Sequence, residues 1–190
     1  MGLRRLLKSI LGGPVEVVIN LEEIMAVLFH RGNKLLLDSV TFLPDGKVVG
    51  RLRVRQEICE GHEPIPGQPV MRGVDLVEMS FQLLGIMLAK DEDLADLRGK
   101  VFVARETGSL KVRSGFIYVG EELVLETRTD VDLEDMGHGL IKVSSCRMTT
   151  KVDGKTRASV DSVTLVGFPD PSSVEPPVET SAKDDEAETS

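Results

Sequence analysis

Residues 61–90, GHEPIPGQPVMRGVDLVEMSFQLLGIMLAK, decide how the rest of this sequence is interpreted. A histidine and a proline-rich segment come first, and a long apolar run follows. Within that run four polar or small positions recur at steps of three and four, which places them along one face of a helix. They are Asp75, Glu78, Gln82 and Gly85. Because nearly every other position is apolar, the run predicts a helix that is buried on almost all sides.

The polar side chains of such a helix need partners in the protein interior. An unpaired ionised carboxylate in an apolar environment is costly. Glu78 and the amide of Gln82, four residues apart, must therefore lie either in a structural hydrogen-bond network or in an active site. The residues of the helix leave both interpretations open.

Composition restricts the classes of protein. The 190 residues suffice for one domain with a core, and the two cysteines, Cys59 and Cys146, are too few for a disulfide framework. We interpret both as buried or inert thiols, with a reactive role as the alternative. No apolar segment is long enough to cross a membrane, so we expect a soluble cytoplasmic protein without membrane association.

The net charge of −8 is concentrated at the end of the chain. Residues 169–190 hold seven acidic residues and one lysine, which leaves 22 basic and 24 acidic residues, a net charge of −2, in residues 1–168. This nearly neutral body has no basic stripe and no tryptophan, so it gives no support for nucleic-acid binding. The tail 169–190 is predicted to be disordered, with an acidic interaction tail as the alternative.

The start of the chain predicts an extension ahead of the folded domain. Within this extension, residues 1–19, the first eleven residues could form a short amphipathic helix that packs on the body or on a partner subunit. The alternative is an anchor at a membrane surface. The folded domain is expected to cover residues 20–168.

The remaining segments of this domain predict a second short helix and several strands. The helix falls at residues 21–29, and a hairpin with the turn Pro44–Gly46 follows it. After residue 100, runs rich in Val, Thr and Ile predict about four more strands, with a two-residue turn at Asp153 and Gly154. The order indicates an α+β domain in which an antiparallel sheet wraps around one long helix.

A resemblance to a known family rests on an ordered set of strings. HRGNKLLLDSVTFLPDGKVVG begins at His30, GHEPIPGQPVMRGVDLVEMSFQ begins at Gly61, and strands with a DGK hairpin follow. Over residues 20–168 this order resembles the (3R)-3-hydroxyacyl-acyl carrier protein dehydratases of bacterial fatty-acid synthesis. The resemblance implies a hot-dog fold, a homodimer or trimer of dimers, and a hydro-lyase that makes trans-2-enoyl thioesters. It implies neither a metal nor an organic cofactor.

The family's functional residues transfer to four positions. The resemblance implies that His62 of one subunit removes the proton beside the thioester carbonyl, and that Glu78 of the other subunit protonates the departing hydroxyl. The backbone N–H of Gly73 would stabilise the charge on the thioester oxygen, and Gln82 would orient a water or the leaving hydroxyl. Taken alone, the histidine is more typical of a loop residue and the glutamate more typical of a structural network than either is of a catalytic site.

Two departures from the family pattern lie near these positions. Glu63, Pro64 and Ile65 stand where the family has a single phenylalanine, which reshapes the loop after the histidine. Arg72 replaces the family's proline before the glycine. This arginine could act on the glutamate of the helix or contact a phosphate.

The other histidines and the basic residues have weaker interpretations. We interpret His30 as part of a structural turn and His138, between two glycines, as a loop residue, and no His or Cys pair has metal-site spacing. Four basic residues follow the long helix, either on a solvated sheet edge or as a patch for acyl carrier protein and its phosphopantetheine-linked acyl chain. They are Lys100, Arg105, Lys111 and Arg113.

Two alternatives to a dehydratase stay open. One is a non-catalytic or acyl-binding hot-dog subunit, which the reshaped loop after His62 makes reasonable. The other is a related thioesterase or enoyl hydratase, although the spacing of Glu78 and Gln82 favours a dehydratase over a thioesterase.

Overall fold

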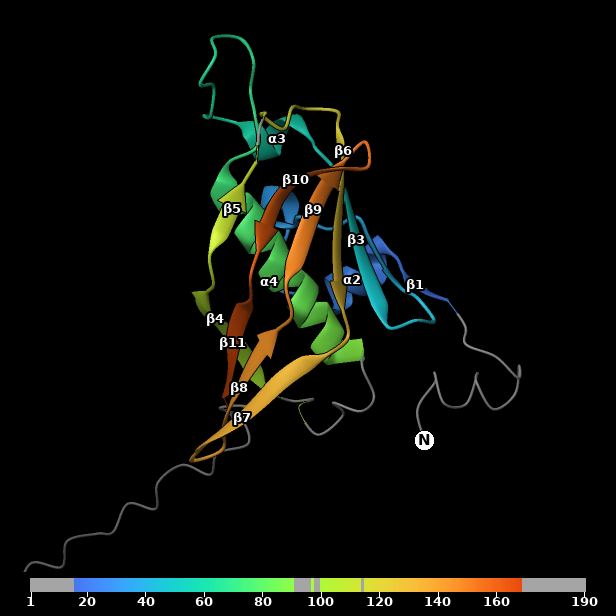
Figure 1. Ribbon diagram of the computed structural model, residues 1–190, viewed down its shortest axis with the longest axis vertical. Helices are drawn as coiled ribbons and strands as arrows, with labels where there is room; N and C mark the ends of the chain where they lie inside the picture. Colours follow the sequence, from blue (N-terminus) through green and yellow to red (C-terminus); the bar gives the residue numbers. More distant parts are fainter. Residues whose placement is uncertain (1–15, 91–96, 98–99, 114, 169–190) are drawn as a thin grey trace, which may run out of the picture.

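The computed structural model describes residues 16–90, 97, 100–113 and 115–168. The helix expected within residues 1–11 and the tail 169–190 lie outside these residues. A long helix, α4 (Gly73–Lys90), runs through the middle of the molecule, and an antiparallel sheet curves around it (Figure 1). The predicted α+β plan is therefore confirmed. None of the helices in the described part of the chain is long and apolar enough to span a bilayer.

The short helix predicted at residues 21–29 is α2 (Leu21–Val27). It begins with a capping box: Oδ1 of Asn20 accepts the N–H of Glu23 at 3.1 Å, and the Glu23 carboxylate accepts the N–H of Asn20 at 3.0 Å. These two bonds satisfy backbone donors that a helix start otherwise leaves unpaired. In residues 16–72, the other helical segments are a 3-10 turn, η1 (Gly32–Lys34), and a short helix, α3 (Gln56–Cys59).

Eleven strands are described, and they form two groups. The seven-stranded group has the order β1-β2-β3-β6-β9-β10-β5, and the four-stranded group has the order β4-β11-β8-β7. The strands are β1 (Val17–Ile19), β2 (Ser39–Phe42), β3 (Lys47–Arg53), β4 (Val101–Thr107), β5 (Leu110–Val112), β6 (Glu122–Arg128), β7 (Val131–Gly137), β8 (Leu140–Ser145), β9 (Met148–Val152), β10 (Lys155–Val160) and β11 (Val163–Phe168).

The two groups are halves of one bent sheet. Strands β4 and β5, β6 and β7, β8 and β9, and β10 and β11 are each separated by only two residues, and each pair passes from one group to the other. The four strands predicted after α4 are thus present, but each bends near its middle. At the bend, Gly108 donates its N–H to Ser162 O at 2.8 Å. A Cβ at Gly108 would lie 2.9 Å from Ser162 Oγ and 3.0 Å from Ser162 N, so any larger residue would have to shift the chain at this contact.

The backbone confirms the predicted turn at Pro44–Gly46 and the predicted two-residue turn at Asp153 and Gly154. Gly46 closes the β2–β3 hairpin with a φ of 81°, and the β9–β10 turn has positive φ at Asp153 and Gly154, 49° and 71°. The two-residue turn, with positive φ at both residues, matches the twist of the strands that it joins.

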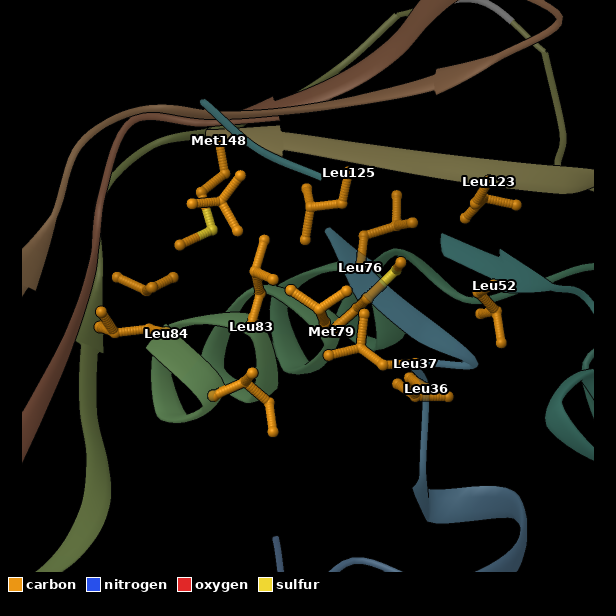
Figure 2. Packing of buried hydrophobic residues seen from close by; sticks show 14 of the residues in the cluster. Leu36, Leu37, Leu52, Leu76, Met79, Leu83, Leu84, Leu123, Leu125 and Met148 are labelled. Carbon is orange, nitrogen blue, oxygen red and sulfur yellow. The ribbon is translucent and has the colours of Figure 1, made fainter. Parts of the chain in front are cut away.

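The core lies between α4 and the concave side of the sheet. Leu76, Met79 and Leu83 on α4 face Leu123 and Leu125 on β6 (Figure 2). All five side chains are buried, three per cent exposed or less. Burying a side chain of this size typically contributes about 1.5 to 3 kcal/mol. The helix is therefore held in place by apolar packing along most of its length.

Candidate active site

A largely apolar cavity of about 750 Å³ lies between the end of α2, α4 and strand β4. Its polar lining includes His30, which follows α2, together with Glu78 and Gln82 of α4. Glu78 supplies the one carboxylate among the described residues that line it. An apolar pocket with a few convergent polar groups is the usual form of a small-molecule site. The cavity can therefore take an apolar chain and present a carboxyl group to it.

The carboxyl group of Glu78 is held by two neighbours. Nε2 of His30 lies 3.0 Å from Oε1 of Glu78, and the Gln82 amide donates to the same oxygen at 3.0 Å. The same amide also donates to Lys34 O at 2.7 Å, while its oxygen accepts the N–H of Leu36 at 2.8 Å. Gln82 thus uses both N–H groups within the chain, and a bond to a water or a substrate requires one of them to exchange.

His30 reaches Glu78 because Arg31 fixes the turn after α2. The guanidinium of Arg31 donates to the carbonyl oxygens of Leu28, His30 and Met25. The structural role expected for this turn describes Arg31 well. The contact between His30 and Glu78 was not predicted, because no local periodicity relates residues so far apart in the chain. The only sequence signal was that HR opens the first string of the family resemblance.

His62 lies outside this cavity, at the base of a hairpin. Its carbonyl accepts the N–H of Val70 at 3.1 Å, and its Nδ1 lies 3.0 Å from Val70 O. A carbonyl can only accept, so Nδ1 carries the proton and donates it. When the ring is neutral, its Nε2 then has the free lone pair that a base requires.

The residues after His62 that depart from the family pattern form the outer part of the same hairpin. Gln68 donates its N–H to Ile65 O at 2.9 Å, and Glu63 accepts the N–H of Gly67 at 3.2 Å. Glu63, Pro64 and Ile65 are all exposed. The extra residues therefore extend the loop outward, beyond α3 in Figure 1, while the base of the hairpin stays closed.

The first turn of α4 contains a separate polar group. The Asp75 carboxylate accepts the backbone N–H of Arg72 at 3.2 Å and its guanidinium at 2.9 and 2.7 Å. The hydrogen bond with Asp75 raises the pKa of Arg72. The guanidinium of Arg72, which was expected near Glu78, is thus paired with Asp75 instead. Gly73, the first residue of α4, is exposed, and its N–H has no carbonyl one turn earlier in the helix to donate to.

The polar side chains along one face of α4 therefore lie in separate environments. Asp75 pairs with Arg72, whereas Glu78 and Gln82 form the cluster with His30. Within one chain, none of the described residues that line the cavity belongs to the His62 hairpin. A site that joins His62 to Glu78 across two subunits stays a prediction.

The cysteines differ in exposure. Cys59 is fully buried, and burial, together with the charge of Asp75, raises the pKa of its thiol. Cys146 is exposed, so of the two predicted alternatives, buried or inert, burial applies only to Cys59. The pKa of the Cys146 thiol is also raised, by partial burial and by the charge of Asp130. The higher pKa lowers the fraction of this cysteine that is present as the reactive thiolate.

The basic residues after α4 lie on β4, β5 and the segments beside them. Lys100 donates to Gly139 O at 2.7 Å, and Lys111 lies 3.6 Å from the Asp161 carboxylate. Arg105 and Arg113 are exposed. Among the described residues, no group of three or more His, Cys, Asp or Glu side chains could hold a metal ion.

Curated proteins give the clearest similarity to this chain, whereas no protein-family model matches it. It is 34% identical over 110 residues to the 3-hydroxyacyl-[acyl-carrier-protein] dehydratase FabZ of Lawsonia intracellularis, covering 56% of this chain and 70% of that protein. It is 32% identical over 125 residues to the FabZ of Roseiflexus castenholzii, covering 64% and 83%. The FabZ of Nitratidesulfovibrio vulgaris is 31% identical over 118 residues, covering 60% and 74%.

A solved structure supports the fold. The dehydratase heterocomplex ApeI:P from Xenorhabdus doucetiae aligns with a TM-score of 0.53 at 13% identity, covering 76% of this chain and 90% of that chain. At this identity the similarity concerns the fold alone. It agrees with the hot-dog fold, in which a curved antiparallel sheet wraps around a central helix.

Proposed function

We propose that this chain, which belongs to the FabZ family of 3-hydroxyacyl-[acyl-carrier-protein] dehydratases, removes water from (3R)-3-hydroxyacyl thioesters held on acyl carrier protein. The product is the trans-2-enoyl thioester, and the family is one of hydro-lyases. The observation that carries the proposal is the position of Glu78, whose carboxyl group lines a 750 Å³ apolar cavity. Such a cavity suits a reaction on an acyl chain, which needs apolar walls and one acid.

In this proposal His62 acts as the base. Its Nε2 takes the proton from the carbon next to the thioester carbonyl, and the electron pair of that C–H bond becomes the new double bond. The hydrogen bond from Nδ1 to Val70 O, 3.0 Å long, supports this role because it fixes the tautomer with a free lone pair on Nε2. General bases of this kind typically contribute about 10²- to 10⁴-fold in rate.

Glu78 acts as the acid, and Gly73 as the donor to the thioester oxygen. The carboxyl proton passes to the hydroxyl of the substrate, and the C–O bond breaks to release water. Charge that builds on the thioester oxygen is stabilised by the N–H of Gly73 at the start of α4, where the helix dipole adds to it. The amide of Gln82 holds Glu78 through the bond of 3.0 Å.

The site requires two subunits, and the free edge formed by β4 and β5 is where we place the contact. These strands are the last members of their groups, at the same edge of the bent sheet. Val101, Val103 and Val112 on this edge are 48%, 45% and 57% exposed. An exposed apolar edge strand is a template for pairing with another strand. Pairing with a second copy about a two-fold axis gives a homodimer with two equivalent sites.

The partner that brings the substrate is acyl carrier protein with a phosphopantetheine arm. Arg105 and Arg113, both exposed, lie on β4 and just after β5. Together with Lys111 they give a local positive charge on a net-acidic chain, which suits an acidic carrier. We propose a cytoplasmic location, which is the compartment expected for bacterial fatty-acid synthesis on a carrier protein.

The test is turnover of a short enoyl thioester in the hydration direction. The purified protein is incubated with crotonyl-coenzyme A and with crotonyl-acyl carrier protein, and loss of enoyl absorbance is followed. We expect loss of absorbance and a product heavier by one water. Release of free thiol instead would indicate a thioesterase. Absence of any turnover on both substrates would overturn the enzymatic proposal and favour an acyl-binding subunit.

A further inference from the structure

The histidine in the cavity is not the one that the family pattern assigns to the chemistry. His30 contacts Glu78 within the same chain, with Nε2 3.0 Å from Oε1. Its other ring nitrogen, Nδ1, is buried and has no hydrogen-bond partner among the described residues. Neither nitrogen is therefore placed to take a proton from a substrate. The only side-chain contact of a His30 nitrogen among the described residues is the one with Glu78.

The direction of the bond between His30 and Glu78 follows from the surroundings of the ring. A doubly protonated ring would leave a charged N–H at Nδ1 buried without an acceptor, which is costly. The neutral ring with its proton on Nε2 uses that proton to bind Oε1 of Glu78. Phe29 stacks on the ring, with centroids 4.3 Å apart and planes 23° from parallel, and this limits its rotation.

Two donors thus converge on one oxygen of Glu78. Oε1 accepts from Nε2 of His30 and from the amide of Gln82, both at 3.0 Å. The other oxygen, Oε2, has no partner among the described residues. A carboxyl group whose Oε1 already receives two N–H groups has room for a proton only on Oε2. The acid of the proposed reaction therefore has a defined oxygen.

The geometry points to His30 as a positioning residue that sets which oxygen of Glu78 transfers the proton; this inference rests on the dehydratase function proposed above. Nε2–H of His30 holds Oε1, so the proton is carried on Oε2. In the dehydration step that proton moves to the departing hydroxyl, whose oxygen keeps the electrons of the broken C–O bond. His30 neither gains nor loses a proton in this step.

A pair of substitutions separates this role from simple packing. His30→Gln keeps an N–H near the position of Nε2, whereas His30→Met keeps a side chain of similar length without a donor. We expect kcat of His30→Met to fall about 10- to 100-fold with KM within about threefold of wild type, because a misplaced acid slows the chemical step. His30→Gln should retain kcat within about fivefold of wild type.

Three kinetic results would overturn the inference. One is a His30→Gln variant as slow as His30→Met, which would make the ring important only for packing. Another is wild-type kcat in His30→Met. The third is a loss confined to KM, which would place His30 in substrate binding. Circular dichroism of both variants checks that each is folded before its rates are compared.

A second measurement does not depend on turnover. The chain has three histidines, so nitrogen-15 labelling of histidine gives few ring signals, and His30→Gln assigns those of His30. At slightly alkaline pH we expect His30 as the Nε2–H tautomer, and a shift of its ring signals in Glu78→Gln. An Nδ1–H or rapidly averaging ring would contradict the inference even if the dehydratase assay is positive. If the assay is negative, this spectrum still tests the contact.

Discussion

His30 and His62 are held in opposite ways. His30 uses Nε2 to contact a side chain, Glu78 Oε1 at 3.0 Å, and its Nδ1 is buried without a described partner. His62 uses Nδ1 to donate to a backbone carbonyl, Val70 O at 3.0 Å, which leaves Nε2 for chemistry. The His30 ring lines the cavity, whereas the His62 ring lies at the base of a hairpin, outside the cavity of its own chain.

The difference shows why proximity to an acid is a poor guide to a catalytic histidine. A ring that contacts the acid through one nitrogen and buries the other can orient that acid but cannot exchange a proton with a substrate. A ring fixed by a backbone carbonyl has a defined tautomer and one free nitrogen. This contrast is the basis for proposing that His30 orients Glu78 and that His62 removes the proton.

The largest effect is expected from removing the base. His62→Ala should lower kcat for hydration of crotonyl thioesters by about 10²- to 10⁴-fold, because proton transfer by a positioned group contributes that much. His138→Asn is the matched control: His138 is exposed in the β7–β8 turn and has a φ of 54°, which asparagine tolerates. A His62→Ala variant as active as His138→Asn would contradict the role of His62 as the base.

A smaller effect is expected from loosening the turn that carries His30. Arg31→Met removes donors to the carbonyls of Leu28, His30 and Met25. We expect a loss of about 0.5 to 1.5 kcal/mol in the free energy of unfolding in urea, since the bonds are partly exposed. The kcat should fall about 3- to 10-fold because Glu78 is held less well.

The exposed Arg53 offers a matched control for this substitution. Arg53→Met should change neither the urea midpoint nor kcat measurably. Unchanged kcat in Arg31→Met, despite the lower stability, would mean that the position of His30 does not depend on this turn.

The smallest effect is expected in the loop that departs from the family pattern. Replacing residues 63–65 by one phenylalanine should change kcat/KM by less than about threefold, a barrier change under about 0.7 kcal/mol. The reason is that His62 and Val70 stay paired at the base of the hairpin while the removed residues are exposed. A loss comparable to that of His62→Ala would show that the extra residues position the histidine.

Local patterns predicted most of the secondary structure. The buried helix followed from the spacing of polar residues in residues 73–90, and the turns at Gly46 and Gly154 followed from residues that adopt positive φ. Apart from the β4–β5 bend, which Gly108 marks, the bends of the later strands could not be predicted in this way. At the β6–β7 bend, Thr129 and Asp130 interrupt the run without a glycine or proline, so the strand pattern continues through it.

The candidate site was predictable only in part. The pairing of Arg72 with Asp75 lies within one helical turn and could have been expected from the three-residue spacing. The contact between His30 and Glu78 depends on how α2 packs against α4, and a single sequence contains no local signal for such packing. The family resemblance named His62 and Glu78, but not His30, which contacts Glu78.

A mixed dimer tests most directly whether His62 and Glu78 act across two subunits. His62→Ala and Glu78→Gln chains with different affinity tags are co-expressed, and the heterodimer is purified through both tags. Each parent dimer should be inactive. In the heterodimer one site has lost both groups and the other keeps both, so we expect about half of the wild-type kcat per dimer. A heterodimer no more active than its parents would contradict a site shared between subunits.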